Sequence, residues 1–231
     1  MLHMAAQTGT TDIVATPHAN DRYVYNLDAV QRKVAELRGI CKDGIQIHHG
    51  CDFHLSFQNI QDALKNPAKY TINGQNYLLV EFSDMAIPPN ATGIFEDMLS
   101  AGMTPIITHP ERNPIIRSHP ELLNEWVGRD CLVQVTADSL LGRFGKSALK
   151  AAAGWIENDL VHVVASDAHN TQSRTPALEK AFAHIANRYS GELAEALFNS
   201  NPRAIITGQA VDATYLKTLR QRPKGWRFRP W

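Results

Sequence analysis

The sequence predicts an α/β fold whose parallel strands close into a barrel, and three observations support this prediction. Short apolar runs rich in valine and isoleucine alternate with helical patterns as far as about Gly208. A histidine, aspartate or glutamate follows each of these runs within a few residues. The composition does not shift along this part of the chain, and 231 residues are enough for one domain of this kind.

Five apolar runs are predicted as central strands of the parallel sheet. The run 160–164 is typical, because it is rich in valine and bounded by polar residues. In the other four cases the runs span residues 12–17, 46–50, 77–80 and 104–108. Active sites of α/β folds form at the carboxyl ends of such strands, so the residues that follow these runs are the candidates for function.

The segments between and after these strands have apolar residues at helical spacing. Asn26 can cap the first of them, Gly102 ends the second, and Pro120 lies in the first turn of the third. Ser190-Gly191 interrupts the last pattern. The predicted helices cover residues 25–41, 90–101, the segment that opens at 118–120, 146–158 and 175–198.

The side chains delivered to one rim have the chemistry of a metal site. Imidazole nitrogens and carboxylate oxygens together suit zinc, manganese or iron. Several of each on one rim could hold two or three ions that share a bridging carboxylate. The candidates are His18, Asp52, Glu81, His109, Asp167 and His169.

Three other histidines have a simpler explanation. His162 falls inside a predicted strand rather than at its end, which favours a buried core histidine with satisfied hydrogen bonds. His48 and His49 are neighbours on a strand, so only one of them can face the barrel interior.

Charge and cysteine content narrow the function classes. The chain has 23 basic and 23 acidic residues, so it offers no argument for nucleic acid or a membrane surface as the main partner. Its three cysteines, an odd number without paired spacing, are typical of reduced thiols. There is no apolar run long enough to cross a bilayer and no basic start followed by an apolar stretch, so we expect a cytoplasmic protein without membrane insertion.

Four motifs follow strand ends along the chain: Ala15-Thr16-Pro17-His18, Val80-Glu81-Phe82, Thr108-His109-Pro110-Glu111-Arg112 and Ala165-Ser166-Asp167-Ala168-His169-Asn170. In order and spacing they resemble the polymerase and histidinol phosphatase (PHP) superfamily. Within it, the chain is similar to the bacterial tyrosine-protein phosphatases of capsular and exopolysaccharide operons, from near the N-terminus to about Gln209. The resemblance implies a distorted (β/α)₇ barrel over residues 1–209. The residues that follow, 210–231, form a separate basic aromatic tail.

The resemblance also implies a distribution of metal ligands at the carboxyl rim. Asp52 would bridge two ions, and Glu81 with His109 would complete the second. The implied cofactor is two or three divalent ions, manganese first, with zinc or iron as alternatives. Asp167 would serve the first ion, and His18 and His169 would serve a third.

The resemblance implies hydrolysis of phosphotyrosine on a partner protein, an autophosphorylating bacterial tyrosine kinase that regulates capsule or exopolysaccharide synthesis. Arg112 and Arg174 match family arginines that face the phosphate. A guanidinium fork can hold two phosphoryl oxygens and offset the charge that develops during attack by water. His169 would protonate the leaving phenolate or hold the metal that assists it.

Two features depart from the family pattern. The family has glutamate where this chain has Asp52, one methylene shorter; the adjacent Cys51 could ligate instead, although a small buried thiol is the preferred interpretation. The family also opens with a strand bearing Asp-x-His-x-His, whereas residues 1–6 have the pattern of the end of a helix. We therefore expect a barrel that lacks its first strand in this chain, with the missing motif encoded upstream of Met1.

Two alternatives stay open at the level of sequence. Other PHP proteins act on small phosphomonoesters, and a barrel without the first histidines could instead be a non-catalytic phosphotyrosine-binding protein. The tail from Lys217 to Trp231 is basic and aromatic, and the preferred interpretation is a loosely docked C-terminus. Neither the oligomeric state nor the kinase follows from the sequence.

Overall fold

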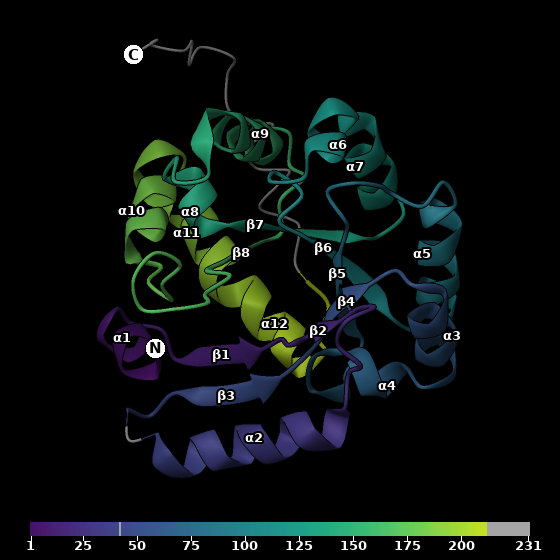
Figure 1. Ribbon diagram of the computed structural model, residues 1–231. Helices are drawn as coiled ribbons and strands as arrows, with labels where there is room; N and C mark the ends of the chain where they lie inside the picture. The colour runs from purple at the N-terminus through teal and green to yellow at the C-terminus, as the bar shows by residue number, and fades with distance from the viewer. Residues whose placement is uncertain (42, 212–231) are drawn as a thin grey trace.

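Parallel strands form the centre of the molecule, with helices packed around them (Figure 1). The structure is a computed structural model that describes residues 1–41 and 43–211. All described strand pairs are parallel, in one six-stranded sheet of order β2-β4-β5-β6-β7-β8 and one two-stranded sheet of β1 with β3. The α/β fold with a parallel sheet is therefore confirmed, and residues 212–231 of the expected tail lie outside the described residues.

The strands match most of the predicted runs. The five runs appear as strands whose ends differ by a few residues, and two short additional strands, β2 and β4, continue the first two runs after a break. The strands are β1 (Asp12–Ala15), β2 (His18–Ala19), β3 (Gln46–His49), β4 (Asp52–His54), β5 (Tyr77–Glu81), β6 (Thr104–Thr108), β7 (Leu132–Thr136) and β8 (Val163–Ala165).

One strand, β7, is absent from the predicted set, and one predicted strand is shorter than expected. The polar Gln134 lies at the middle of β7 and interrupts its apolar character. The last strand begins at Val163, so His162 precedes it, contrary to its predicted place inside the strand. Tertiary pairing with β6 and β8 makes β7 a strand, which periodicity alone does not reveal.

The two sheets continue one another, because the same two segments of the chain pair in both, with a short interruption between them. Residues of β1 pair with β3, and residues of β2 with β4, with the partner 34 positions later in both cases. Pro17 lacks an N–H between β1 and β2. At Gly50, between β3 and β4, a Cβ atom would lie 2.9 Å from the Val14 side chain. The interruption therefore allows the segment that contains Val14 to pack closely against the segment that contains Gly50.

Helices confirm most of the predicted segments. The Asn26 side chain accepts a hydrogen bond from Ala29 N–H, and Gly102 follows α5 with φ of 80°. The helices include α1 (Leu2–Gln7), α2 (Leu27–Ile40), α3 (Phe57–Lys65), α4 (Pro67–Tyr70), α5 (Ala91–Ser100), α6 (Pro114–Ser118), α7 (Pro120–Val127), α8 (Ala137–Leu140), α9 (Gly145–Glu157), α10 (Glu179–Arg188), α11 (Gly191–Glu195) and α12 (Asn201–Thr207), with a 3₁₀ turn at Ile72–Gly74 and a π-helical turn at Ala196–Ser200.

The last predicted helix is corrected at its start and confirmed at its break. It begins at Glu179 rather than Thr175, since residues 171–178 form the loop that follows the last strand and contain Pro176. The break near Ser190 is present, and the Ser190 hydroxyl accepts a hydrogen bond from Leu193 N–H at the start of α11.

The two faces of the strands contribute to different clusters. Outward residues such as Val80 and Ile107 pack in the large core with the surrounding helices. Inward residues such as Leu79 and Ile106 pack with Ile205 of α12. The Tyr77 hydroxyl, at the amino end of β5, donates to Gln209 O just after α12 (2.8 Å). Because α12 packs at this end, the carboxyl ends of the strands form the accessible rim of the barrel.

The strands do not close on themselves within the described residues. There, β8 pairs only with β7, and the β1–β2 segment pairs only with the β3–β4 segment. The described strands therefore have two free edges, one at β8 and one at the β1–β2 segment. None of the helices in the described ranges has the length and apolar character that a bilayer crossing requires.

His162 is a buried core histidine, as predicted. It is 5% exposed, and its Nδ1 accepts a hydrogen bond from Val133 N–H (3.2 Å). Burial lowers the pKa of this imidazole to about 4, so the ring stays neutral in the folded protein at neutral pH.

We predict that His162 makes the fold less stable in acid. An unfolded histidine takes up a proton below about pH 6.5 while the buried one resists until about pH 4, which removes about 3 kcal/mol of folding free energy between these values. Urea unfolding from pH 7 to 4 should show a weaker pH dependence in His162→Gln than in the wild type and in the surface control His3→Gln. Equal slopes, or a ring that protonates near pH 6.5 in an NMR titration of the folded protein, would contradict this assignment.

Candidate metal centre

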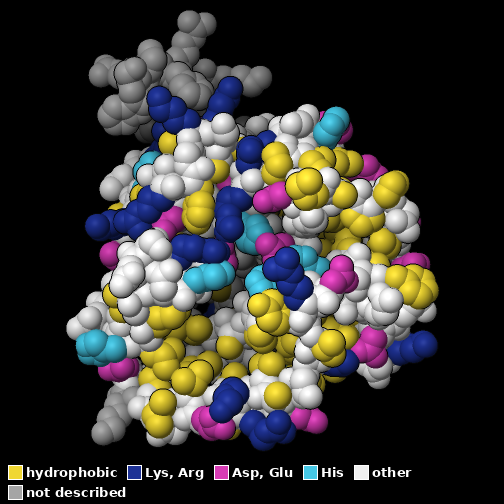
Figure 2. Space-filling view, viewed as in Figure 1, with side chains coloured by type: hydrophobic (Ala, Val, Ile, Leu, Met, Phe, Trp, Pro, Cys, Tyr) yellow, Lys and Arg dark blue, Asp and Glu magenta, His cyan; other side chains and the backbone are white. Residues whose placement is uncertain are grey.

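Four side chains converge at the carboxyl ends of β2, β4 and β5. Each of them offers one ligand atom, and these atoms all lie within 4.8 Å of one another. Figure 2 shows histidine, acidic and basic side chains gathered around a hollow near the middle of this face. We call His18, Asp52, His54 and Glu81 the metal quartet.

Strand register brings the metal quartet together. His18 is the register partner of Asp52, and His54 is the partner of Glu81. Along β4 the side chains alternate, so Asp52 and His54 share one face while Phe53 points into the core on the other. Two adjacent parallel strand pairs thus place two imidazoles and two carboxylates in one small volume.

The distances within the quartet are those of close polar contacts. His18 Nδ1 lies 2.8 Å from Asp52 Oδ2, and His54 Nε2 lies 2.9 Å from Glu81 Oε2. The other oxygen of the same glutamate, Oε1, lies 3.4 Å from His109 Nε2. Glu81 therefore faces the quartet with one oxygen and His109 with the other.

The donor set fits a divalent cation. Four buried quartet atoms, His18 Nδ1, Asp52 Oδ1, His54 Nε2 and Glu81 Oε2, make no hydrogen bond of ordinary geometry. Burial and the adjacent Glu81 carboxylate raise the pKa of Asp52 to about 9. Two carboxylates in a partly desolvated site repel each other, and a cation between them removes the repulsion while it uses the unpaired ligand atoms.

Two arginines flank the quartet and share one carboxylate. Arg112 Nη1 and Arg174 Nη2 both donate to Asp167 Oδ2. The guanidinium of Arg112 also lies over the Phe144 ring, 4.6 Å from its centroid. Arg112 and Asp167 both shift the pKa of Asp52, which places this trio beside the quartet. The trio itself has two positive groups and one negative group.

A loop after β8 holds Arg174 in place. The side-chain oxygen of Asn170 accepts hydrogen bonds from the N–H groups of Gln172, Ser173 and Arg174, at 2.8 to 3.1 Å. The main-chain N–H of His169 donates to Arg174 O (2.9 Å). Asn170 therefore closes the loop on itself and determines where the arginine projects.

A buried glutamate holds the loop that carries Arg112. Glu111 is fully buried, and its Oε1 accepts hydrogen bonds from Thr136 N–H (2.9 Å) and the Ser139 hydroxyl (2.7 Å). Burial raises the pKa of this carboxyl. Arg117 donates to Arg112 O (2.6 Å) and to Glu111 O (3.0 Å). The loop after β6 is thus anchored to the end of β7 and to α8.

Two candidate residues have strained backbones. His109 has φ of 35° and Asp167 has φ of 49°, both in the left-handed region that non-glycine residues rarely adopt. The His109 N–H donates to Gln134 O (2.8 Å), which holds the conformation. Both residues come directly after strands or one residue beyond them, where such strain commonly accompanies function.

The structure places the six candidate ligands in three settings. His18, Asp52 and Glu81 lie in the quartet, and His109 contacts it through Glu81. Asp167 lies with the two arginines. His169 lies apart from the quartet: its ring is 46% exposed, and Nδ1 lies 3.0 Å from Asp167 O.

His54 is the member of the quartet that the sequence analysis does not single out. The signal was available, because Asp52 and His54 are two residues apart and a strand places such residues on one face. Cys51 and His48 lie elsewhere. Burial raises the pKa of the Cys51 thiol, which keeps it neutral, and His48 Nε2 lies 2.7 Å from Asp12 Oδ1. The small buried thiol predicted for Cys51 is therefore present.

Comparisons with known proteins show the family of the chain. Residues 1–207 match the family model of capsular polysaccharide synthesis, CpsB/CapC. The chain is 34% identical to the CapC protein of Staphylococcus aureus, with 98% of this chain and 89% of that protein covered. It is 32% identical to tyrosine-protein phosphatase YwqE of Bacillus subtilis (91% and 84% covered) and 31% identical to tyrosine-protein phosphatase CpsB of Streptococcus pneumoniae (91% and 90%).

A solved structure has the same fold. It comes from a crystallographic study of YwqE from Bacillus subtilis and CpsB from Streptococcus pneumoniae, which describes them as unique metal-dependent tyrosine phosphatases. The TM-score is 0.85 at 30% sequence identity, and the match covers 92% of this chain and 87% of that chain.

We predict that His54 contributes to metal binding. The His54→Ala variant removes one of four converging ligand atoms and should weaken Mn²⁺ binding at least tenfold without unfolding the protein. Isothermal titration with Mn²⁺ measures the affinity, circular dichroism checks the fold, and His3→Ala on α1 is the exposed control. An unchanged affinity in a folded His54→Ala protein would remove His54 from the site.

Proposed function

Since the chain belongs to the CpsB/CapC family of capsular polysaccharide synthesis, we propose that it is a metal-dependent phosphotyrosine-protein phosphatase. One observation carries this proposal: a quartet of partly buried imidazole and carboxylate ligands lies beside two arginines that share one aspartate. A cation site next to guanidinium groups is suited to a phosphate monoester, whose oxygens need both kinds of partner.

The cofactor we propose is a cluster of two or three divalent ions, with manganese preferred over zinc or iron. The metal quartet and His109 would hold it, with Glu81 facing both groups of ligands. Such ions, when bound, offset phosphoryl charge and lower the pKa of a coordinated water. Asp167 is proposed as a further ligand, in exchange for part of its pairing with the arginines.

The arginines are proposed to bind and orient the phosphoryl group. Arg112 and Arg174 reach the same oxygen of Asp167, so their guanidinium groups converge beside the quartet. A phosphate dianion brought to this point can accept hydrogen bonds from both, and their positive charge offsets the charge that grows on the equatorial oxygens. Without substrate, Asp167 accepts hydrogen bonds from both guanidinium groups.

His169 is proposed as the proton donor to the leaving phenolate. It lies two residues beyond Asp167 on the same rim, and almost half of its side chain is exposed. An exposed imidazole near neutral pH can carry a proton to a group at the mouth of the site.

The substrate we propose is a phosphotyrosine-bearing protein in the cytoplasm. It would be an autophosphorylating tyrosine kinase that regulates capsule or exopolysaccharide synthesis. We propose no nucleic-acid partner.

We predict that the purified chain hydrolyses a phosphotyrosine peptide only with a divalent cation. Activity should be lost in EDTA and return with Mn²⁺, because without a cation the quartet offers no positive charge to the phosphate. Malachite-green assay of phosphate release, with metal content from mass spectrometry, tests this on the printed chain and on a version extended upstream in the gene. Peptide binding without metal or turnover in both versions would instead support a non-catalytic phosphotyrosine-binding protein.

We predict that Arg174→Ala lowers kcat for the phosphotyrosine peptide roughly 10²-fold, because one positive donor to the phosphoryl group is lost. Metal content should not change, as Arg174 offers no ligand atom. Arg174→Lys keeps the charge but not the fork and should recover only part of the rate. Arg129→Ala, which breaks a surface pair with Glu96, is the matched control. Loss of metal in Arg174→Ala would assign this residue a structural role.

A further inference from the structure

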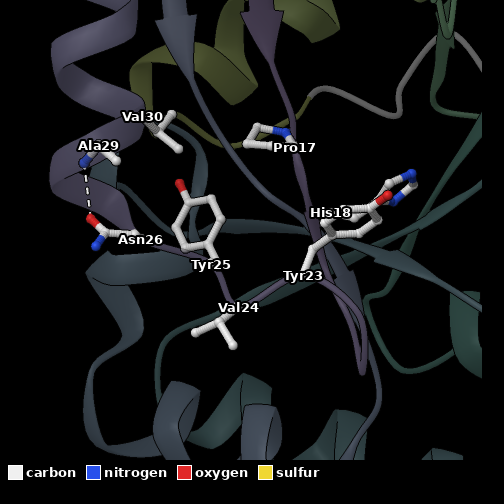
Figure 3. Close-up of a pocket in the computed structure, with 8 residues that line it drawn as sticks. All are labelled: Pro17, His18, Tyr23, Val24, Tyr25, Asn26, Ala29 and Val30. Atoms are coloured by element: carbon white, nitrogen blue, oxygen red, sulfur yellow. Dashed lines mark hydrogen bonds between the residues drawn. The ribbon is translucent and has the colours of Figure 1, made fainter.

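An apolar pocket opens directly beside the metal quartet. It has a volume of about 400 Å³ and lies between β2 and the start of α2. Its lining includes the quartet residue His18, and Figure 3 shows Tyr25 and Val30 on one side of it and Pro17 and His18 on the other. None of its lining residues is Asp, Glu, Lys or Arg. The pocket therefore contrasts with the charged rim that it adjoins, and the two share one imidazole.

The walls of the pocket are held in place by hydrogen bonds. Tyr25 is 5% exposed, and its hydroxyl donates to Gly50 O (3.0 Å). The side-chain oxygen of Asn20 accepts from the N–H groups of Arg22 and Tyr23, and Asn20 and Tyr23 exchange two main-chain hydrogen bonds. A closed turn thus presents the residues at the pocket mouth, and Asn26 caps the helix that forms the opposite wall.

Two residues at this mouth expose apolar surface. Tyr23 is 60% exposed and Val24 is 95% exposed. The Tyr23 ring stacks against the His18 ring, with centroids 6.4 Å apart and planes inclined by 22°. Single exposed apolar residues are common on protein surfaces. Here, however, an aromatic ring in contact with a candidate metal ligand forms the border between a cation site and an apolar pocket.

We propose that this pocket receives the aromatic ring of a phosphotyrosine side chain while its phosphate lies at the quartet and the arginines. This inference rests on the proposed phosphatase function. A phosphate held beside His18 has its ester oxygen within reach of the same imidazole, and the pocket begins there. The aryl group then contacts Tyr23 and the apolar wall behind it, where aromatic pairs gain stability beyond their buried area.

The pocket would make the site selective for aryl phosphates. The side chain of phosphoserine has one methylene between backbone and phosphate oxygen, so it would leave the pocket unfilled. The phenyl ring of phosphotyrosine would instead displace water from apolar surface. Tyr23 is accordingly a specificity residue: it contacts the part of the substrate that does not react.

The test compares Tyr23→Ala and Tyr23→Phe with the wild type on a phosphotyrosine peptide and its phosphoserine counterpart, in Mn²⁺. Tyr23→Ala should raise KM for the phosphotyrosine peptide roughly three- to tenfold and reduce the preference over phosphoserine by the same factor. Its metal content should match the wild type. Tyr23→Phe keeps the ring and should retain the wild-type KM. Ile40→Ala, an exposed apolar residue at the far end of α2, is the matched control.

The outcomes separate this inference from the proposed function. If the wild type hydrolyses the phosphotyrosine peptide and Tyr23→Ala has the same KM and preference, the ring does not bind in this pocket. An equal loss in Tyr23→Phe would mean that the hydroxyl, not the ring, is responsible, and would also overturn the inference. If the metal-loaded wild type hydrolyses no aryl phosphate, the phosphatase proposal itself fails, and the ring site fails with it.

Discussion

The burial of Asp52 and Glu81 side by side is the constraint on which the rest of the site depends. Two carboxylates at adjacent strand ends repel each other in a partly desolvated environment, and burial with this proximity raises the pKa of Asp52 to about 9. His18 and His54 approach them but leave ligand atoms without hydrogen bonds. The strands hold all four in place through their register, so the backbone keeps together groups that repel each other without a cation.

Loops that follow the other strands supply the positive charge. Arg112 and Arg174 come from segments far apart in the sequence and meet at Asp167. Neither loop is held by the site itself: Glu111 anchors one through β7 and α8, and Asn170 closes the other. These anchors would let the arginines exchange Asp167 for another anion without loss of the surrounding structure, which suits the binding and release of phosphate that we propose for them.

His18 lies at the meeting point of two environments. One edge of its ring contacts Asp52 in the quartet, and one face stacks on Tyr23 at the apolar pocket. The proposed roles follow from this position. Polar groups on one side of His18 would bind the phosphate, and apolar groups on the other side would contact the aromatic ring that carries it.

The sequence by itself determined the parallel α/β class, the strand ends that carry His18, Asp52, Glu81 and His109, and the burial of His162. These features follow from local pattern, since apolar runs define strands and polar residues at their ends must face the rim. Sequence pattern did not reveal β7, where Gln134 interrupts the apolar run, or the late start of α10 after a long loop.

Only the tertiary structure decided which candidates share a site. The pairing of β4 with β2 and β5 brought His54 into the quartet. The loops after β6 and β8 brought Arg112 and Arg174 to Asp167 and left almost half of the His169 side chain exposed. Strand register sets the distances in the quartet. Register depends on contacts between segments far apart in the sequence, such as His18 with Asp52 and His54 with Glu81, rather than on any local run of residues.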